Sequence, residues 1–150
     1  MTFISIPEEV RELLDGPNYA HISTLQEDGS PRNHVVWIWR EGDHVVVPTS
    51  RGQRKARDLD RDPRIGLSIL DQDDPYQMAA IRGQVLEVRS GDDHTLMDRI
   101  ARKYTGAPFP GNDPDLVYYV IGVTSAYQRT ITGFSHNPDG LTPMPAGCCG

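Results

Sequence analysis

The sequence predicts a single-domain, mainly β fold, in which about six short antiparallel strands close into a small barrel with two or three helices packed outside it. Strand-like runs separated by tight turns containing Asp and Gly predict hairpins. Apolar and polar residues alternate within these runs, as they do in strands with one buried face. Only two or three segments have helical spacing, and the chain contains no internal repeat.

The first half of the chain begins with a helix and continues with strands. Ser5 and Glu8 have the spacing of a capping box, so a helix is expected to start there and to end at Gly16-Pro17. Strand-like runs follow at residues 19–25, 33–40 and 44–49. A short helix is then expected over residues 53–59, and Asp62-Pro63 should stop it.

The second half contains longer strands and one more helix. A fourth strand is indicated by the alternation of Ile65, Leu67 and Ile69. A long strand over residues 76–88 is interrupted by Gly83, where a bulge is expected. The remaining expectations are a helix over 92–104, a loop over 107–114 and a last strand over 118–131. Residues 1–133 should form the folded domain, with 134–150 as a loosely ordered tail that holds Cys148 and Cys149.

Composition narrows the classes of protein. The 150 residues carry a net charge of −6, with a pI of about 5.2 and a mean hydropathy of −0.49. No run approaches the ~18 apolar residues that span a bilayer, and the start of the chain lacks the features of a secretory signal. The acidic balance argues against a nucleic-acid partner. A cytoplasmic protein with no membrane partner is therefore expected.

Common catalytic and metal motifs do not occur in this sequence. It has no P-loop, no dinucleotide-binding glycine pattern and no nucleophile elbow. Asp92-Asp93-His94 has metal-ligand side chains, but its place at an expected helix start favours capping, so no metal is predicted. Trp37 and Trp39 share one face of a strand and are interpreted as core or dimer interface rather than as a binding platform.

The positive charge of this acidic chain gathers in residues 49–64, TSRGQRKARDLDRDPR. Hydroxyls at the end of a strand, N–H groups at the start of a helix and several cations converge there, which predicts an anion site. The alternative is a solvated helix face, partly neutralised by Asp58, Asp60 and Asp62. The six cations of this stretch are Arg51, Arg54, Lys55, Arg57, Arg61 and Arg64.

The order of these motifs resembles the pyridoxamine 5'-phosphate oxidase-like split-barrel family, and most of all its flavin/deazaflavin (F420-dependent) oxidoreductase branch. The resemblance covers roughly residues 5–132. The Leu-x-x-Asp-Pro-Arg ending, at Leu59 to Arg64, is its most specific part. The other matching pieces are Asp28-Gly29-Ser30-Pro31, Thr49-Ser50, Lys55, Arg57 and the Gly83 strand that follows the acidic loop at residues 73–76.

The resemblance implies an FMN-binding split β-barrel that forms a homodimer with its cofactor at the subunit interface. Most of the branch uses coenzyme F420, whereas other branches use FMN and some bind haem. Ser50 and Lys55 should then hold the phosphate, and Arg51 or Arg57 could reach the acidic tail of F420. The implied cofactor-binding residues are Asn33, His34, Val35 and Pro48 along the ring, Thr49, Ser50, Gln53, Arg54, Lys55 and Arg57 around the anionic groups, and Tyr76 and Met78 from the partner subunit.

The function expected from this resemblance is an F420H2-dependent reductase, which transfers a hydride from the reduced deazaflavin to an activated double bond of a small organic substrate. Because the cofactor carries such chemistry, no catalytic residue is assigned. Two alternatives stay open: an FMN-dependent pyridoxamine-phosphate-oxidase-like enzyme, and a non-catalytic protein that binds F420 or haem. Arg61 and Arg64 are interpreted as scaffold residues in the turn that leads into the fourth strand.

Overall fold

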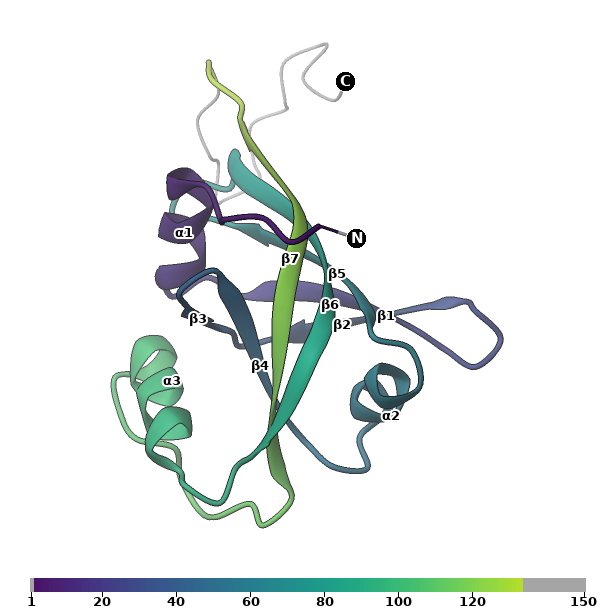
Figure 1. Ribbon diagram of the computed structural model, residues 1–150. Coiled ribbons are helices and arrows are strands. Elements are labelled where there is room, and N and C mark those ends of the chain that lie inside the picture. Colours follow the sequence, from purple (N-terminus) through teal and green to yellow (C-terminus); the bar gives the residue numbers. More distant parts are fainter. Residues whose placement is uncertain (1, 134–150) are drawn as a thin grey trace, which may run out of the picture.

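The computed structural model describes residues 2–133, so the predicted tail and its two cysteines lie outside the described residues. The described part forms one antiparallel sheet with three helices around it (Figure 1). The helices are α1 (Glu8–Asp15), α2 (Arg54–Arg61) and α3 (Thr95–Thr105). The strands are β1 (Ala20–Leu25), β2 (Pro31–Val36), β3 (Trp39–Glu41), β4 (His44–Ser50), β5 (Arg64–Leu70), β6 (Gln77–Ser90) and β7 (Leu116–Thr130). The mainly β fold is confirmed, and no helix in residues 2–133 is long and apolar enough to cross a bilayer.

The barrel is split between β2 and β3. The strand order is β2-β1-β5-β6-β7-β4-β3, so these two strands form the edges of the sheet although only Trp37 and Ile38 separate them in the chain. The single strand expected over residues 33–40 is therefore wrong. The Ile38 N–H donates to the Tyr104 hydroxyl at 3.2 Å, so the chain leaves β1 at this point. It then pairs with β4 as β3, which leaves the barrel open at this edge and not closed as the sequence suggested.

The interior of the barrel holds the main core. Inward residues alternate along β1 and β5 as the sequence predicts, with Ala20, Ile22 and Thr24 buried in β1. Helices α1 and α2 add side chains to the same core, among them Leu14 and Leu59. The two helices thus cover parts of the barrel interior that the strands leave open, and this fixes the place of α2 beside the end of β4.

A second core lies outside the barrel, between β7, β4 and α3. Residues 116–123 of β7 are all buried because both faces of the strand are covered. Tyr119 and its alternate neighbours point into the barrel, whereas Tyr118 and Val120 pack with Val46 against Met97 of α3. Helix α3 therefore lies against the outer face of β4 and β7 (Figure 1).

Two of the predicted helix starts need correction. The capping box of Ser5 and Glu8 does not form, since the N-cap of α1 is Pro7 and has no side-chain hydrogen bond. The chain before α1 is held instead by Asp43, whose Oδ1 accepts the Ile6 N–H at 2.9 Å. Helix α3 begins at Thr95, three residues later than expected, because Asp93 accepts the Thr95 N–H at 2.9 Å in a turn before the helix.

The expected bulge at Gly83 is confirmed. The pairing of β6 with β7 shifts register between Arg82 and Gly83. A Cβ atom at Gly83 would overlap the carbonyl oxygen of Gly122 on β7, so only glycine permits this approach of the two strands.

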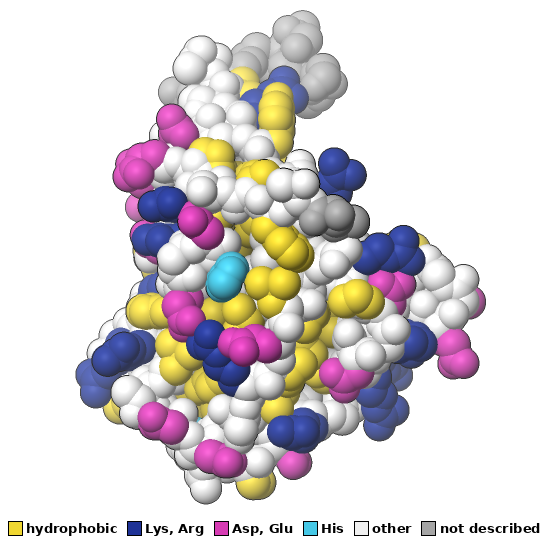
Figure 2. All heavy atoms as spheres, viewed as in Figure 1, with side chains coloured by type: hydrophobic (Ala, Val, Ile, Leu, Met, Phe, Trp, Pro, Cys, Tyr) yellow, Lys and Arg dark blue, Asp and Glu magenta, His cyan; other side chains and the backbone are white. Residues whose placement is uncertain are grey.

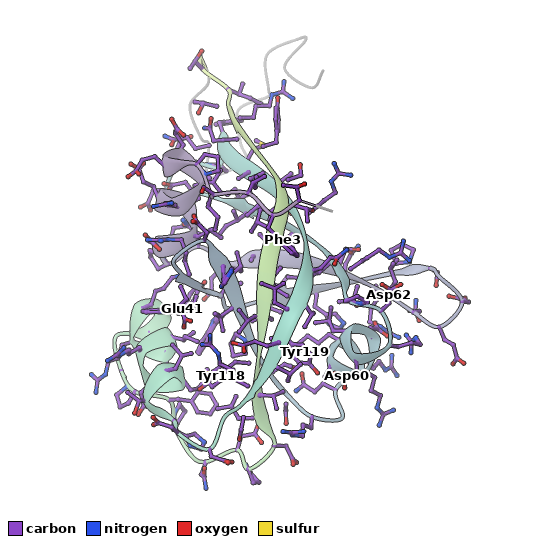
Figure 3. The ribbon with its side chains drawn as sticks, viewed as in Figure 1. Phe3, Glu41, Asp60, Asp62, Tyr118 and Tyr119 are labelled. Carbon is purple, nitrogen blue, oxygen red and sulfur yellow. The ribbon has the colours of Figure 1, made fainter. Side chains whose placement is uncertain are left out.

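The start of the chain crosses the outer face of β7. The Ile4 N–H donates to the carbonyl of Val123 at 2.8 Å, and the Phe3 ring lies over Gly122 beside Leu86 (Figure 3). Apolar side chains gather around this crossing, with charged groups at their margin (Figure 2). The N-terminal segment thus covers part of the sheet that the helices do not reach.

Lys103 joins α3 to the segments around it. Its Nζ donates to the carbonyl of Leu14 at 2.5 Å and to that of Ile38 at 3.1 Å, and it lies 4.9 Å from the ring centroid of Tyr104. Burial lowers the pKa of Lys103 to about 8, although Asp15 opposes the shift. Its amine therefore loses its proton within an experimentally accessible pH range.

Replacing Lys103 by methionine is expected to remove a rise of stability with pH. Between pH 8 and 10.5 the unfolded lysine holds its proton while the folded one has lost it, so the wild type gains stability as the pH rises. The gain relative to Lys103→Met should be about 1 kcal/mol between pH 7 and 9.5, because partial exposure reduces the full linkage value. Urea unfolding of both proteins at these two pH values measures it. If the wild type and Lys103→Met differed in free energy of unfolding by the same amount at both pH values, the lowered pKa of Lys103 would be contradicted.

Candidate functional site

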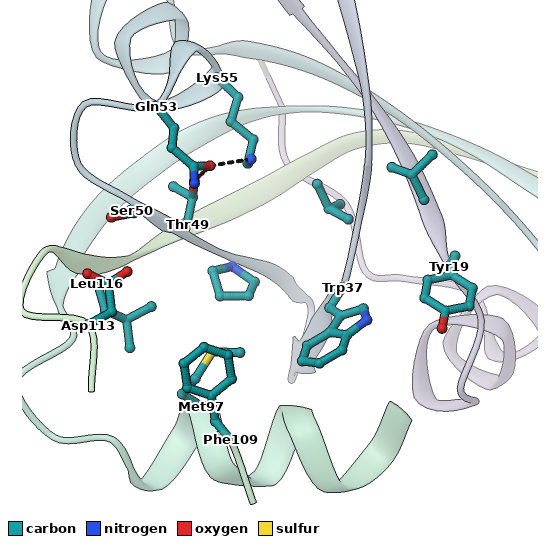
Figure 4. Close-up of a pocket in the computed structure, with 13 residues that line it drawn as sticks. Tyr19, Trp37, Thr49, Ser50, Gln53, Lys55, Met97, Phe109, Asp113 and Leu116 are labelled. Carbon is teal, nitrogen blue, oxygen red and sulfur yellow. Dashed lines mark hydrogen bonds between the residues drawn. The ribbon is translucent and has the colours of Figure 1, made fainter. Parts of the chain in front are cut away.

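A cavity of about 370 Å³ opens where β2, β4, α2 and the loop after α3 meet (Figure 4). Its volume lies in the range of small-molecule sites. The residues that line it are Tyr19, Val35, Val36, Trp37, Pro48, Thr49, Ser50, Gln53, Lys55, Met97, Phe109, Asp113 and Leu116.

One end of the cavity is polar. The Thr49 hydroxyl and the Lys55 ammonium both donate to Gln53 Oε1, at 3.1 and 2.6 Å, and Ser50 lies on the same side (Figure 4). Burial lowers the pKa of Lys55 below its usual value. A hydroxyl and an ammonium therefore meet within hydrogen-bond distance of one atom, where an oxyanion could take the place of the amide oxygen.

The N-terminus of α2 faces the same end. Gln53 is its N-cap and makes no side-chain capping bond, and the first i to i−4 bond runs from the Arg57 N–H to the Gln53 carbonyl at 3.1 Å. The N–H groups of the residues before Arg57 thus have no partner within the helix. Together with the helix dipole they favour a negative group at this point.

The cations of residues 49–64 divide into two groups. Arg61 pairs with Asp58 at 2.9 Å and Arg64 pairs with Asp62 at 2.8 Å, so both are neutralised as scaffold residues. In the part of the chain that the structure describes, no carboxylate lies within 4.0 Å of the cationic groups of the other four, which are Arg51, Arg54, Lys55 and Arg57. These four leave positive charge at the start of α2.

The alternative of a helix face partly neutralised by three carboxylates holds only for the end of α2, where Asp58 and Asp62 pair with Arg61 and Arg64. Asp58 is 2% exposed and accepts from Thr24, Arg32 and Arg61. Asp60 accepts the Tyr119 hydroxyl at 2.8 Å (Figure 3), and burial followed by this bond raises the pKa of Tyr119. Both carboxylates hold α2 against the barrel, and neither forms an ion pair with Arg51, Arg54, Lys55 or Arg57.

His34 lies on β2, directly beside this positive charge. Its Nε2 is buried and has no hydrogen-bond partner among residues 2–133. Burial, with further contributions from Lys55 and Arg32, lowers the pKa of His34, so the ring is neutral at pH 7. A buried nitrogen without a partner is costly unless a ligand supplies one.

The structure brings together half of the residues implied to bind the cofactor. Asn33 is exposed on β2, and Arg54 and Arg57 are exposed on α2 outside the lining. Met78 lies on the outer sheet face, where it lines a second cavity of about 310 Å³, and Tyr76 precedes it in the chain. The six that line the first cavity are Val35, Pro48, Thr49, Ser50, Gln53 and Lys55.

Sequence reasoning missed the apolar end of the cavity. The interpretation of Trp37 as core or dimer interface is incomplete, because this side chain lines the cavity while also packing on Tyr104. Trp39 packs against the outer core and does not line the cavity. The break between β2 and β3 separates the two tryptophans, and no local pattern revealed it. Tyr19, Met97, Phe109, Asp113 and Leu116 were also missed, since distant segments bring them together.

Residues 6–130 match the family model described as pyridoxamine 5'-phosphate oxidase, and the chain belongs to this family. Together with the strand order, this match defines the class of protein as a pyridoxamine 5'-phosphate oxidase-like split barrel. A structure named F420 reductase is 26% identical over 81% of this chain and 98% of its own, with a TM-score of 0.74.

Two further structures show the same fold at lower identity. The conserved hypothetical protein Rv2991 from Mycobacterium tuberculosis is 16% identical, covering 91% of this chain and 95% of its own, with a TM-score of 0.68. General Stress Protein 26 from Bacillus anthracis is 19% identical, covering 81% and 92%, with a TM-score of 0.63. No curated protein matches the chain.

Proposed function

We propose that this protein is an F420H2-dependent reductase, which transfers a hydride from the reduced deazaflavin to an activated double bond of a small organic substrate. The observation that carries the proposal is the unneutralised positive charge at the start of α2, next to Lys55 and the polar end of the cavity. Coenzyme F420 has a phosphate and an acidic tail, so its charge complements this end. The 26% identity with an F420 reductase gives independent support.

The side chains of the cavity fit such a cofactor. Ser50 and Lys55 would hold the phosphate, with Thr49, Gln53 and Arg54 beside them. Arg51 or Arg57 would reach the acidic tail, since both are exposed near the start of α2. Asn33, His34, Val35 and Pro48 would lie along the ring, although of these four only Val35 and Pro48 line the cavity.

When bound, the deazaflavin supplies the hydride. The protein would orient the ring against the substrate and limit the access of water. Its contribution to the rate is therefore the positioning of the two reactants. Lys55 and the first N–H groups of α2 would hold the anionic end of the cofactor. Met97, Phe109 and Leu116 add apolar lining to the cavity, which would limit the access of water to the ring. Solvent or a nearby Tyr or His could supply the proton that follows the hydride, so no residue is assigned as its donor.

Purified protein mixed in parallel with F420, FMN and haem tests the proposal. F420 should bind, as seen by fluorescence quenching, and F420H2 should be oxidised when a cyclic enone is added. Tight binding of FMN without binding of F420 would refute the deazaflavin assignment. Binding of F420 without turnover of any activated alkene would instead identify a carrier.

The second candidate is an FMN-dependent enzyme of the pyridoxamine-phosphate-oxidase type. The family model, which covers residues 6–130, favours it. FMN has a single phosphate and no acidic tail, so it would use Lys55 and Ser50 but leave Arg51 and Arg57 without a role. Because Arg51 and Arg57 form no ion pair within the described part of the chain, they favour the first candidate.

We further propose that two copies of the chain associate through the outer face of the sheet. One row of this face runs across five strands from β2 to β7 and ends at Tyr127, which is 63% exposed. Its residues, in order, are Val35, His21, Ser68, Ala80 and Tyr127. Val35 also lines the first cavity, so a second copy on this face would border the cofactor and could bring its Tyr76 and Met78 to it.

Replacing Tyr127 by glutamate is expected to convert the dimer into monomers and to weaken cofactor binding at the same time. A carboxylate in an apolar interface core carries a large desolvation cost. Light scattering coupled to size-exclusion chromatography measures the mass. Val88→Glu is the matched control, because Val88 is an exposed apolar residue of β6 that does not belong to this row; the variant should remain dimeric. A monomeric wild type would overturn the interface.

A further inference from the structure

Three aromatic side chains form a stack at the end of the cavity away from Lys55. The Trp37 and Tyr104 rings are parallel within 5°, with centroids 5.2 Å apart. The Tyr19 ring lies 5.4 Å from that of Tyr104, tilted by 31°. Trp37 and Tyr19 line the cavity, and Tyr104 lies behind them on α3.

The stack is fixed by hydrogen bonds. The Tyr104 hydroxyl donates to the Asn18 carbonyl at 2.8 Å and accepts the Ile38 N–H at 3.2 Å. Lys103 lies 4.9 Å from the centroid of the same ring. Tyr104 is thus tied to the segment before β1 and to the link between β2 and β3. Because Trp37 is part of that link, Tyr104 sets the orientation of the indole.

The two ends of the cavity therefore have different chemistry. Lys55, Gln53 and Thr49 provide donors at one end, whereas Trp37, Phe109 and Met97 stand at the other (Figure 4). A ligand that fills the cavity should have an anionic group at its first end and a flat apolar part at its second. One face of the indole lies on Tyr104, so a ring that stacks on Trp37 would use the opposite face.

We infer that Trp37 is the ring-stacking residue of this site, that Tyr104 is its positioning residue, and that the ligand carries a planar conjugated ring at the end opposite its anionic group. The inference rests on the proposed function for the identity of that ring. It goes beyond that function by naming the side chains, Trp37 and Tyr104, that contact and support the ring. It also separates two binding contributions, because ring stacking and anion binding use different residues.

Trp39 provides a matched control. It is also partly buried and packs on the same outer core beside α3, but it does not line the cavity. Trp37→Leu and Trp39→Leu therefore make the same chemical change two residues apart. Trp37→Phe keeps an aromatic face, and Tyr104→Leu removes the support behind the indole.

The experiment measures the affinity of each variant for F420 and for the phosphate-free deazaflavin riboside, together with the absorbance shift of the bound ring. Trp37→Leu should lose about 5-fold to 100-fold affinity for both ligands and lose the shift. Trp37→Phe should retain most of both, and Tyr104→Leu should show a smaller loss than Trp37→Leu. Lys55→Ala should lose affinity for F420 alone, and Trp39→Leu should match the wild type.

The outcomes separate this inference from the proposed function. If the wild type binds F420 and Trp37→Leu binds the riboside with unchanged affinity and shift, the inference is overturned while the function stands. If Trp37→Leu does not fold, Tyr104→Leu replaces it, and an unchanged riboside affinity and absorbance shift in Tyr104→Leu would overturn the inference. If the wild type binds only FMN, riboflavin replaces the riboside in the same variants. If it binds no ring ligand, both proposals fall.

Discussion

Replacing Asp58 by alanine is expected to lower the free energy of unfolding by about 3 kcal/mol or more, since removing one partner of a buried ion pair leaves the others uncompensated. Asp58 is 2% exposed, and its two oxygens accept from Thr24, Arg32 and Arg61 at 2.8 to 2.9 Å. The substitution leaves the buried Thr24 hydroxyl without this acceptor and removes the attachment of α2 to β1 and β2. Urea unfolding at pH 7 measures the loss.

The pH dependence of this effect has a definite sign. Burial alone would raise the pKa of Asp58, but the bonds from Arg32, Thr24 and Arg61 lower it below its usual value. Its stabilisation is therefore present above about pH 4 and is lost as the pH falls further. The difference in the free energy of unfolding between the wild type and Asp58→Ala should therefore become smaller below about pH 4.

The matched control for this experiment is Asp62→Ala. Asp62 pairs with Arg64, whose side chain is 66% exposed, so water replaces the lost partner and the loss should be much smaller. Equal losses for the two variants would contradict the role given to the buried network.

Replacing Lys55 by alanine is expected to weaken the binding of F420 by about 1.5–3 kcal/mol, which is the range for a hydrogen bond to a charged group and corresponds to roughly 10-fold to 150-fold. Lys55 lines the cavity, and its ammonium donates to Gln53 at 2.6 Å. This hydrogen bond holds the side chain in place before the ligand binds, so little side-chain entropy is lost on binding. Titration of deazaflavin fluorescence measures the change.

The control for this prediction is Arg64→Ala. Arg64 belongs to the same basic stretch but is paired with Asp62, so its removal should leave the affinity within about twofold. Wild-type binding should also weaken with added salt more steeply than that of Lys55→Ala, since the variant has lost one of the cations. Unchanged affinity in Lys55→Ala would refute the phosphate assignment.

The sequence alone was sufficient where the signal was local. Alternation predicted β1 and β5, Gly83 predicted the bulge, and Asp62-Pro63 predicted the end of α2. The polar end of the cavity belongs to this class, because the end of β4 and the start of α2 are consecutive. Thr49, Ser50, Gln53 and Lys55 are therefore brought together by a single turn of the chain.

Where the sequence failed, a distant partner decided the outcome. Residues 33–40 look like one strand, yet the Tyr104 hydroxyl on α3 takes the Ile38 N–H and ends the pairing with β1. Asp58 looks like a solvated helix carboxylate, yet Arg32 of β2 lies 2.8 Å from it inside the barrel wall. Hydrogen bonds between segments 26 to 66 residues apart leave no local pattern to read.

The sequence by itself thus determined a mainly β barrel and an anion-binding turn in front of a short helix, because hydrophobic period and helix-end chemistry act over a few residues. Only the tertiary structure decided that four of the six cations form no ion pair within residues 2–133, and that Trp37 forms the far wall of the same cavity. Both facts depend on which groups meet across the barrel. Which groups come into contact is decided by the packing of α2 and α3 against strands that are distant in the sequence.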